Sequence, residues 1–273
     1  MLSSLLVAHH FGRRAFIWML FIASLLFYGW WYPPYLFILL TSIVVNFCLG
    51  RLLERGNRPR QILLFLGLAF NLGLLGYYKY ADFLITSFLG LVNVNLTVTA
   101  VILPIGISFF TFQQIAYLID IYRGIKGRYT FSEYGLFVSF FPQLIAGPIV
   151  HHREMMPQFS TLTTANLSLR MSIGLSLIVF GLFKKVVLAD TIAEFSSPVF
   201  EMADAGMQIT LFPAWIAAVG FSLQIYFDFS GYTDIAIGLG ALFGIKLPKI
   251  FFLTKRVLLL ISGNGGISRC RVS

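Results

Sequence analysis

The sequence has little charge for its length, and most of that charge is positive. Of the 273 residues, 11% are charged and 58% are hydrophobic, and 20 lysines and arginines outnumber 11 aspartates and glutamates. The mean hydropathy is +0.84. A globular domain needs a polar surface, which this composition does not supply, so the sequence predicts a multi-pass membrane protein rather than a soluble one.

Cysteine and the common catalytic motifs are also missing or scarce. The two cysteines are Cys48, in an apolar run, and Cys270, and neither has the spacing of a metal site or a disulfide framework. The sequence contains no HExxH, no GxSxG, no P-loop and no GxGxxG pattern that opens a helix. We therefore expect no metal site and none of the familiar soluble-enzyme centres.

The basic residues that are present gather in short segments between apolar runs. Residues 13–14 are both arginine, residues 51–60 contain four arginines, and residues 123–128 contain three more basic side chains. Such clusters mark cytoplasmic loops and contact anionic lipid headgroups. No basic surface is interleaved with aromatic residues, so we expect the lipid bilayer as a partner and no nucleic acid.

The apolar runs predict helices that cross a bilayer. We expect spans at residues 15–31, 35–50, 61–77, 102–121 and 167–188, and a final pair of segments at 209–227 and 230–244. Residues 82–98 and 190–207 are interpreted as interfacial. The predicted fold class is an all-α polytopic membrane protein, with residues 1–248 forming one transmembrane domain.

The stretch at residues 134–150 is too short for a comfortable span and is interrupted by Pro142, Gly147 and Pro148. Irregular backbone at membrane depth must be buried in protein or line a cavity, because lipid offers no hydrogen-bond partners. We therefore interpret this stretch as a re-entrant segment.

Residues 221–246 are apolar enough to enter a bilayer, yet they carry Gln224, Asp228 and Asp234. A carboxylate at membrane depth costs at least about 2.5–3.5 kcal/mol, so it usually faces a partner, a cavity or a substrate path. On a helix, Gln224, Asp228 and Tyr232 would lie along one side. The aspartates either serve a site directly or are structural, as caps of broken helices or partners of a basic residue elsewhere, and the sequence leaves both interpretations open.

A second stripe on the same segment consists of Gly231, Ile235 and Gly238. Small residues at this spacing allow another helix to approach closely inside a membrane. The segment is therefore predicted to pack against a neighbouring helix along this stripe.

Two pairs of titratable residues are further candidates. His151 and His152 follow the Gly147–Pro148 break, and a histidine can act as a general base, but nothing nearby in the sequence supplies an orienting partner. A headgroup-facing loop is the favoured interpretation of this pair. Lys184 and Lys185 fit either the phosphates of an anionic donor or an interfacial anchor.

Four stretches, in this order, resemble the membrane-bound O-acyltransferase family: LPIGISFFTFQQIAYLIDIYRG (103–124), SFFPQLIAGPIV (139–150), GLFKKVVLAD (181–190) and QIYFDFSGYTDIAIGLGALFGIKLP (224–248). The sequence is most similar to the branch that contains the bacterial alginate and peptidoglycan O-acetyltransferase membrane subunits. The D-alanyl transfer protein of lipoteichoic acid is a more distant relative. The resemblance covers about residues 15–248.

The resemblance implies a helical bundle with re-entrant segments around a tunnel in the bacterial cytoplasmic (inner) membrane. An acetyl group from cytoplasmic acetyl-CoA would pass across the membrane to a polysaccharide, with help from a periplasmic acetyltransferase partner. The chemistry would be histidine-assisted attack of a hydroxyl, or of a relay nucleophile, on a thioester. The residues expected to support the tunnel are Gln224, Asp228, Ser230, Tyr232 and Asp234, and those expected to shape the re-entrant wall are Pro142, Gln143, Gly147 and Pro148.

The sequence departs from the family pattern after residue 248. The family's catalytic histidine lies in an Asp-Phe-Trp-x-Arg-Trp-His-Ile-Ser-Leu-Ser motif downstream, and this sequence lacks it. The reading frame can be shifted by one base, so that each new codon takes the last base of one codon and the first two bases of the next. From Leu260 onward, such shifted codons permit this same motif. We therefore interpret residues 249–273 as out-of-frame translation after a one-base frameshift near Lys249, and we expect the sequence as given to be inactive.

Two rival interpretations come from other classes. A small-solute transporter would also have broken helices and buried carboxylates, but the sequence shows no repeated half and matches four family motifs. A non-functional pseudogene fragment is the second rival. The resemblance favours the acyltransferase.

Overall fold

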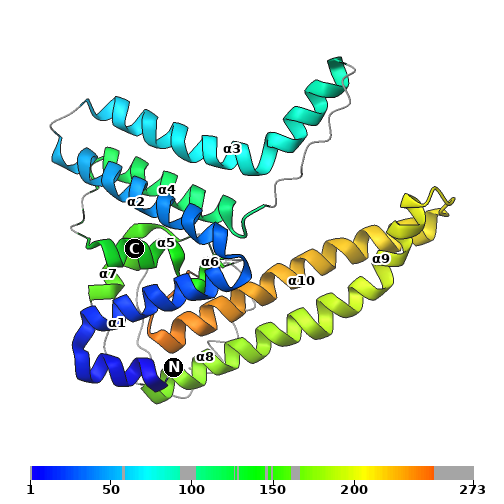
Figure 1. The fold of residues 1–273 in the computed structure, drawn as a ribbon. Helices are drawn as coiled ribbons and strands as arrows, with labels where there is room; N and C mark the ends of the chain where they lie inside the picture. Colours follow the sequence, from blue (N-terminus) through cyan, green and yellow to red (C-terminus); the bar gives the residue numbers. More distant parts are fainter. Residues whose placement is uncertain are drawn as a thin grey trace. The chain divides into compact units, whose positions relative to one another are not determined.

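The computed structural model describes residues 2–56, 59–92, 103–125, 127, 129–144, 147–148, 150–160 and 167–248. The chain divides into two compact units, which are presented separately. The first comprises Met1–Ile145 and Ile149–Thr161, and the second Ala146–Pro148 and Leu162–Ser273. Helices make up both units (Figure 1). The predicted out-of-frame tail, including Cys270, lies outside the described residues.

The first unit contains seven helices among its described residues: α1 (Leu2–Trp31), α2 (Pro33–Arg55), α3 (Arg60–Val92), α4 (Ile107–Tyr122), α5 (Phe131–Ser139), α6 (Phe141–Leu144) and α7 (His152–Ser160). Long helix α2 packs against α1, α3 and α4, and α5 packs against α1 and α7. Helix α1 is kinked at Gly12, which has a φ of 78°. Glycine adopts such a positive φ without the steric penalty that other residues meet.

Amide side chains join the long helices of this unit. Asn46 of α2 and Asn71 of α3 exchange hydrogen bonds, with each Nδ2 donating to the other's Oδ1 at 3.2 and 2.6 Å. Ser42 donates to Gln114 Oε1 of α4 at 3.1 Å. All four side chains are fully buried. Such interhelical hydrogen bonds favour association where the surroundings are apolar and hydrophobic burial alone gives no preference.

The basic segments predicted to share one side of the membrane meet at one end of this unit. Arg51 donates to the carbonyl of Tyr129 at 2.8 Å, and Arg60 donates to the carbonyls of Ile121 and Tyr122 at 3.0 and 2.6 Å. The last two carbonyls belong to the final turn of α4, which a cation stabilises. The loops at 51–60 and 121–129 therefore lie together, while their cytoplasmic location stays a prediction.

The second unit contains four helical elements among the residues that can be placed: α8 (Leu167–Leu182), the π-helical segment η1 (Phe183–Ala189), α9 (Asp190–Asp204) and α10 (Leu211–Phe243). Elements α8, η1 and α9 follow one another as a continuous rod, and α10 runs beside it (Figure 1).

The predicted small-residue stripe forms the contact between these rods. A Cβ atom added at Gly231 would lie 2.8 Å from the carbonyl oxygen of Gly181, and one added at Gly238 would lie 2.7 Å from that of Gly174. The backbones of α8 and α10 are therefore too close for any side chain at these positions. This confirms the prediction that a helix approaches along the stripe.

Four stretches in the described part of the chain are long and apolar enough to cross a membrane: Pro33–Arg55, Arg60–Ala81, Leu167–Asp204 and Leu211–Phe243. They confirm a multi-pass membrane protein. The predicted break between 209–227 and 230–244 is wrong, because α10 is continuous through Asp228 and Phe229. Likewise α3 continues beyond residue 77 to Val92, and the rod beyond 188 to Asp204; residues 93–98 lie outside the described part.

Replacing Gly238 with alanine is expected to weaken this helix pair. In a helix, glycine to alanine normally stabilises by about 1 kcal/mol, but the new Cβ would meet the Gly174 carbonyl at 2.7 Å. Gly220→Ala on the same helix is the matched control, because its nearest contact is 3.4 Å, to the Ser196 side chain. Unfolding in mixed detergent–SDS micelles should show loss of stability for Gly238→Ala only; equal effects would contradict the close contact.

Candidate functional site

Lys184 of η1 makes the central polar contact of the second unit. Its Nζ atom donates to Asp234 Oδ2 at 2.5 Å and to Ser230 Oγ at 2.9 Å, both on α10. The exposed fractions of the Lys184 and Asp234 side chains are 1% and 0%. A buried charge is tolerated only when it is paired and hydrogen-bonded, and here both conditions hold.

Lys185, the next residue, makes a second and more exposed cluster. Its Nζ lies 2.6 Å from Asp190 Oδ1 and 3.0 Å from Asp228 Oδ1, and 5.9 Å from the centre of the Tyr232 ring. Two consecutive lysines thus reach α10 at points six residues apart. Both lysines belong to the seven residues of η1, which are wound as a π-helix. Short π-helical segments often mark functional sites.

The predicted side of α10 continues to Gln224. Ser196 of α9 donates to Gln224 Oε1 at 3.2 Å. Gln224, Asp228 and Tyr232 therefore all meet the α8–η1–α9 rod, as their spacing on one helical side predicts, and Ser230 and Asp234 meet Lys184. The structure brings all five predicted supporting residues to one helix interface. This favours the interpretation in which the aspartates pair with basic residues over the one in which they cap broken helices.

This arrangement suits support better than chemistry. Lys184 Nζ donates to both Ser230 Oγ and Asp234 Oδ2, so it is positioned as a hydrogen-bond donor to the serine rather than as an acceptor of its proton. The polar cluster instead fixes the register of α10 against the α8–η1–α9 rod. The C-terminal end of α10 is also held in place. After Phe243, Gly244 reverses the chain with a φ of 80°, and Ile245 donates to the carbonyl of Gly240 at 2.8 Å. Ile245 and Leu247 are buried.

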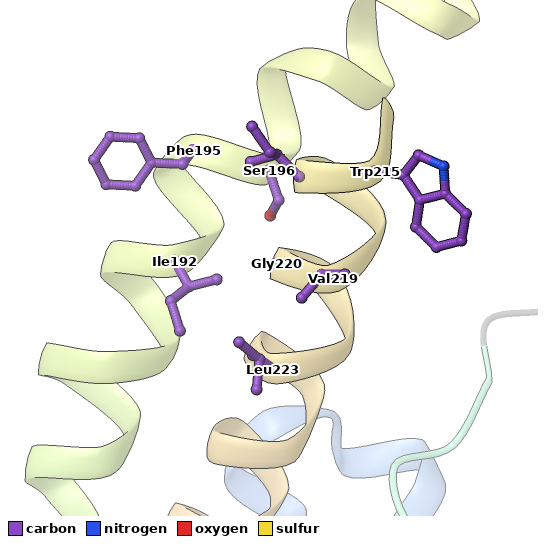
Figure 2. A pocket seen from close by; sticks show the side chains of 8 residues that line it. Ile192, Phe195, Ser196, Trp215, Val219, Gly220 and Leu223 are labelled. Carbon is purple, nitrogen blue, oxygen red and sulfur yellow. The ribbon is translucent and has the colours of Figure 1, made fainter. Parts of the chain in front are cut away.

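A groove of about 530 Å³ lies between α9 and α10, beyond Gln224. Figure 2 shows Ile192 and Leu223 facing the space between the helices, and Phe195 and Trp215 projecting away from it on opposite sides. Ser196 is the one hydroxyl-bearing residue that lines this groove. The lining suits hydrocarbon and offers no cation for the phosphates of a donor and few groups for a sugar.

The predicted re-entrant wall falls into two groups. Pro142 and Gln143 are buried in α6 of the first unit, and Gln143 Oε1 accepts no hydrogen bond from the described residues. Gly147 and Pro148 are also buried and belong with the second unit. The short helices α5 and α6 and the irregular backbone at 147–148 agree with the predicted interruption, and the role of these residues stays a prediction.

A third cluster lies in the first unit, around His152. Its Nδ1 atom lies 3.3 Å from Asp120 Oδ2 of α4, and Arg153 Nε lies 3.4 Å from the same oxygen. No local pattern in the sequence indicates this partner, because Asp120 lies 32 residues before His152. A carboxylate inside the apolar run at 102–121 was the available signal. No group of three or more metal-binding side chains occurs among the residues that the structure describes.

The sequence of the chain is similar to those of known proteins. The sequence model of the membrane-bound O-acyltransferase family matches residues 106–256. A peptidoglycan O-acetyltransferase of Helicobacter pylori is 42% identical over 263 residues, which cover 86% of this chain and 49% of that protein. The protein named probable alginate O-acetylase AlgI of Pseudomonas aeruginosa is 38% identical, covering 88% and 46%.

A more distant relative extends the comparison. A teichoic acid D-alanyltransferase of Streptococcus thermophilus is 27% identical over 150 residues, which are 54% of this chain and 36% of that protein. The chain spans about half the length of the H. pylori and P. aeruginosa relatives.

Replacing Lys184 with methionine is expected to destabilise the second unit by about 3–5 kcal/mol, because a buried carboxylate would lose its counter-charge. Lys185→Met is the matched control. Its side chain is 28% exposed, so it should cost no more than about 1 kcal/mol. Unfolding in mixed detergent–SDS micelles measures both, and similar losses for the two variants would contradict a special role for the buried pair.

Proposed function

The chain belongs to the membrane-bound O-acyltransferase family, and from this premise we propose that it serves as a membrane O-acetyltransferase for an extracytoplasmic polysaccharide. The two O-acetylating relatives, at 42% and 38% identity, carry the proposal. Both are named for acetyl transfer to a polysaccharide. The transporter alternative has no comparable support.

Peptidoglycan is the acceptor that we propose. The H. pylori peptidoglycan O-acetyltransferase is more similar to this chain than the alginate O-acetylase of P. aeruginosa, at 42% against 38%. Alginate is the second candidate, because the difference in identity is small.

Acetyl-CoA is the proposed donor, used from the cytoplasmic side of the inner membrane. The end of the first unit where Arg51 and Arg60 meet the loop at 121–129 is basic, which suits an anionic donor as well as anionic headgroups. In the proposed reaction a hydroxyl oxygen attacks the thioester carbonyl carbon, a histidine takes the hydroxyl proton, and the thiolate leaves. A periplasmic partner would complete delivery to the glycan.

The five supporting residues are proposed to position the reacting segment rather than to react. Ser230 and Asp234 lock α10 to Lys184, and Asp228 and Tyr232 contact Lys185. Residues 245–248 are then held by the end of α10, upstream of the position where the family's histidine motif would follow. A one-ångström displacement of a reacting group can reduce rate about a hundredfold, so this anchoring bears on catalysis. The wall residues Pro142, Gln143, Gly147 and Pro148 would bound the tunnel.

The histidine itself is proposed to be encoded in the shifted reading frame. The family match continues through Lys249 to residue 256, and the shifted codons that permit the Trp-His motif begin at Leu260. This supports a change of frame between residues 256 and 260, later in the sequence than Lys249. The sequence as given is therefore proposed to be inactive, and the gene with the frame restored to be active.

The test starts with sequencing of the gene from the codon of Leu247 onward, followed by complementation. In a strain deleted for this locus, the frame-restored gene should raise the acetate that base releases from purified peptidoglycan. The sequence as given should leave it unchanged, because it lacks the family's histidine motif.

Acetate that appears with the sequence as given would overturn the proposed inactivity. Acetate that rises in alginate and not in peptidoglycan would change the acceptor. No rise in either glycan from the frame-restored gene would overturn the proposed function.

A further inference from the structure

His152 opens α7 and is buried at the end of the first unit where the basic loops meet. The Asp120 carboxylate of α4 lies within ion-pair distance of both His152 and Arg153, at 3.3 and 3.4 Å. One carboxylate oxygen therefore holds the first two residues of α7 against α4. Farther along α7, the buried side chains of Met155, Met156 and Phe159 complete the packing.

Aromatic rings enclose the imidazole on its other sides. Tyr117 of α4 and Tyr129 meet the ring edge-on, with centroid separations of 5.4 and 6.2 Å. Tyr117 in turn packs against Tyr134 of α5 at 4.6 Å, and Tyr134 is fully buried. The exposed fraction of His152 is 2%, so no substrate could reach the ring in this conformation. A role as general base is therefore disfavoured.

The charged groups around the ring act in opposite directions, because Asp120 favours an added proton whereas Arg153 and His151 oppose it. Asp120 is the single facing carboxylate among the described residues, and Arg153 shares it. On α2, Arg51 donates to the carbonyl of Tyr129 and pairs with Glu54 at 3.4 Å. Nδ1 of His152 faces the Asp120 carboxylate, whereas Nε2 is buried without a hydrogen-bond partner in the described part of the chain. A protonated imidazole would bury an N–H group that lacks an acceptor.

We propose that His152 is a pH-responsive positioning residue: the neutral imidazole lets α7 pack on α4 and α5, and the protonated imidazole releases α7. The proposal stands independently of acetyl transfer, since it concerns the packing of α7.

Burial is the main cause that lowers the pKa of His152 below its ordinary value of 6.5; Asp120 opposes the shift, and Arg153 and His151 add to it. The folded-state pKa is thus below the unfolded one. Packing that depends on the neutral ring is fully present above the unfolded pKa. It is lost as the pH falls below that value toward the folded pKa.

Hydrogen exchange of the α7 amides tests this. The chain in detergent micelles would be measured from about pH 7.5 to about pH 5.5, across the ordinary histidine range, with correction for the intrinsic pH dependence of exchange. In the wild-type chain, opening of residues 152–160 should increase as the pH falls, by at most about tenfold per pH unit, the limit for one proton. His152→Gln should remove this dependence.

His151→Gln is the matched control, since His151 is adjacent and exposed; it should keep the acid response of α7, because it is only the smallest cause of the His152 pKa shift. Asp120→Asn keeps the histidine and removes its carboxylate, so α7 should be less protected at every pH but should still respond to acid. A pH response that survives in His152→Gln, or is absent from the wild-type chain, overturns the proposal. His152→Gln could leave the α7 amides unprotected at every pH. In that case the Asp120→Asn variant is the test, and loss of its acid response also overturns the proposal.

Discussion

The buried contact between Lys184 and Asp234 is the interaction on which the second unit depends. Two charges on lipid-spanning helices are tolerable because they neutralise each other, and Lys184 also donates to Ser230. The pair also determines which residues of the two rods can face each other. The exposed cluster of Lys185, Asp190 and Asp228 lies beside it and adds little energy of its own.

Close packing and charge pairing reinforce one another in this unit. Gly231 and Gly238 bring the backbones of α8 and α10 together, and the short separation lets a lysine in η1 reach a carboxylate on α10. The π-helical segment carries both lysines, and each of them pairs with an aspartate on α10. Residues 245–248 continue from this end of α10, where Ile245 donates to the carbonyl of Gly240 and Leu247 is buried, and the proposed acetyl transfer would use this anchored segment.

Much of this unit could be predicted from the sequence. The period-four spacing of Gln224, Asp228 and Tyr232 identified the face that meets the rod, and the glycine stripe identified the close contact. The identity of the partner could not be predicted, because Lys184 and Lys185 lie 50 and 43 residues away from Asp234 and Asp228 and no local pattern links them. The predicted break in α10 failed for the same reason: a carboxylate neutralised by a distant lysine does not interrupt a helix.

The first unit shows the same limit. Apolar runs and the residue pattern at 134–150 indicated helices and an interruption, but the contact of Asp120 with His152 joins elements that are distant in the sequence.

A double-mutant cycle on Lys184 and Asp234 tests the central claim most directly. Unfolding in mixed detergent–SDS micelles would compare Lys184→Met, Asp234→Leu and the double variant. If the charges stabilise the helix pair by neutralising each other, the double variant should be more stable than the sum of the single losses implies, with a coupling energy of about 2–3 kcal/mol. Additive losses would contradict the claim and leave the glycine contact as the determinant of the α8–α10 register.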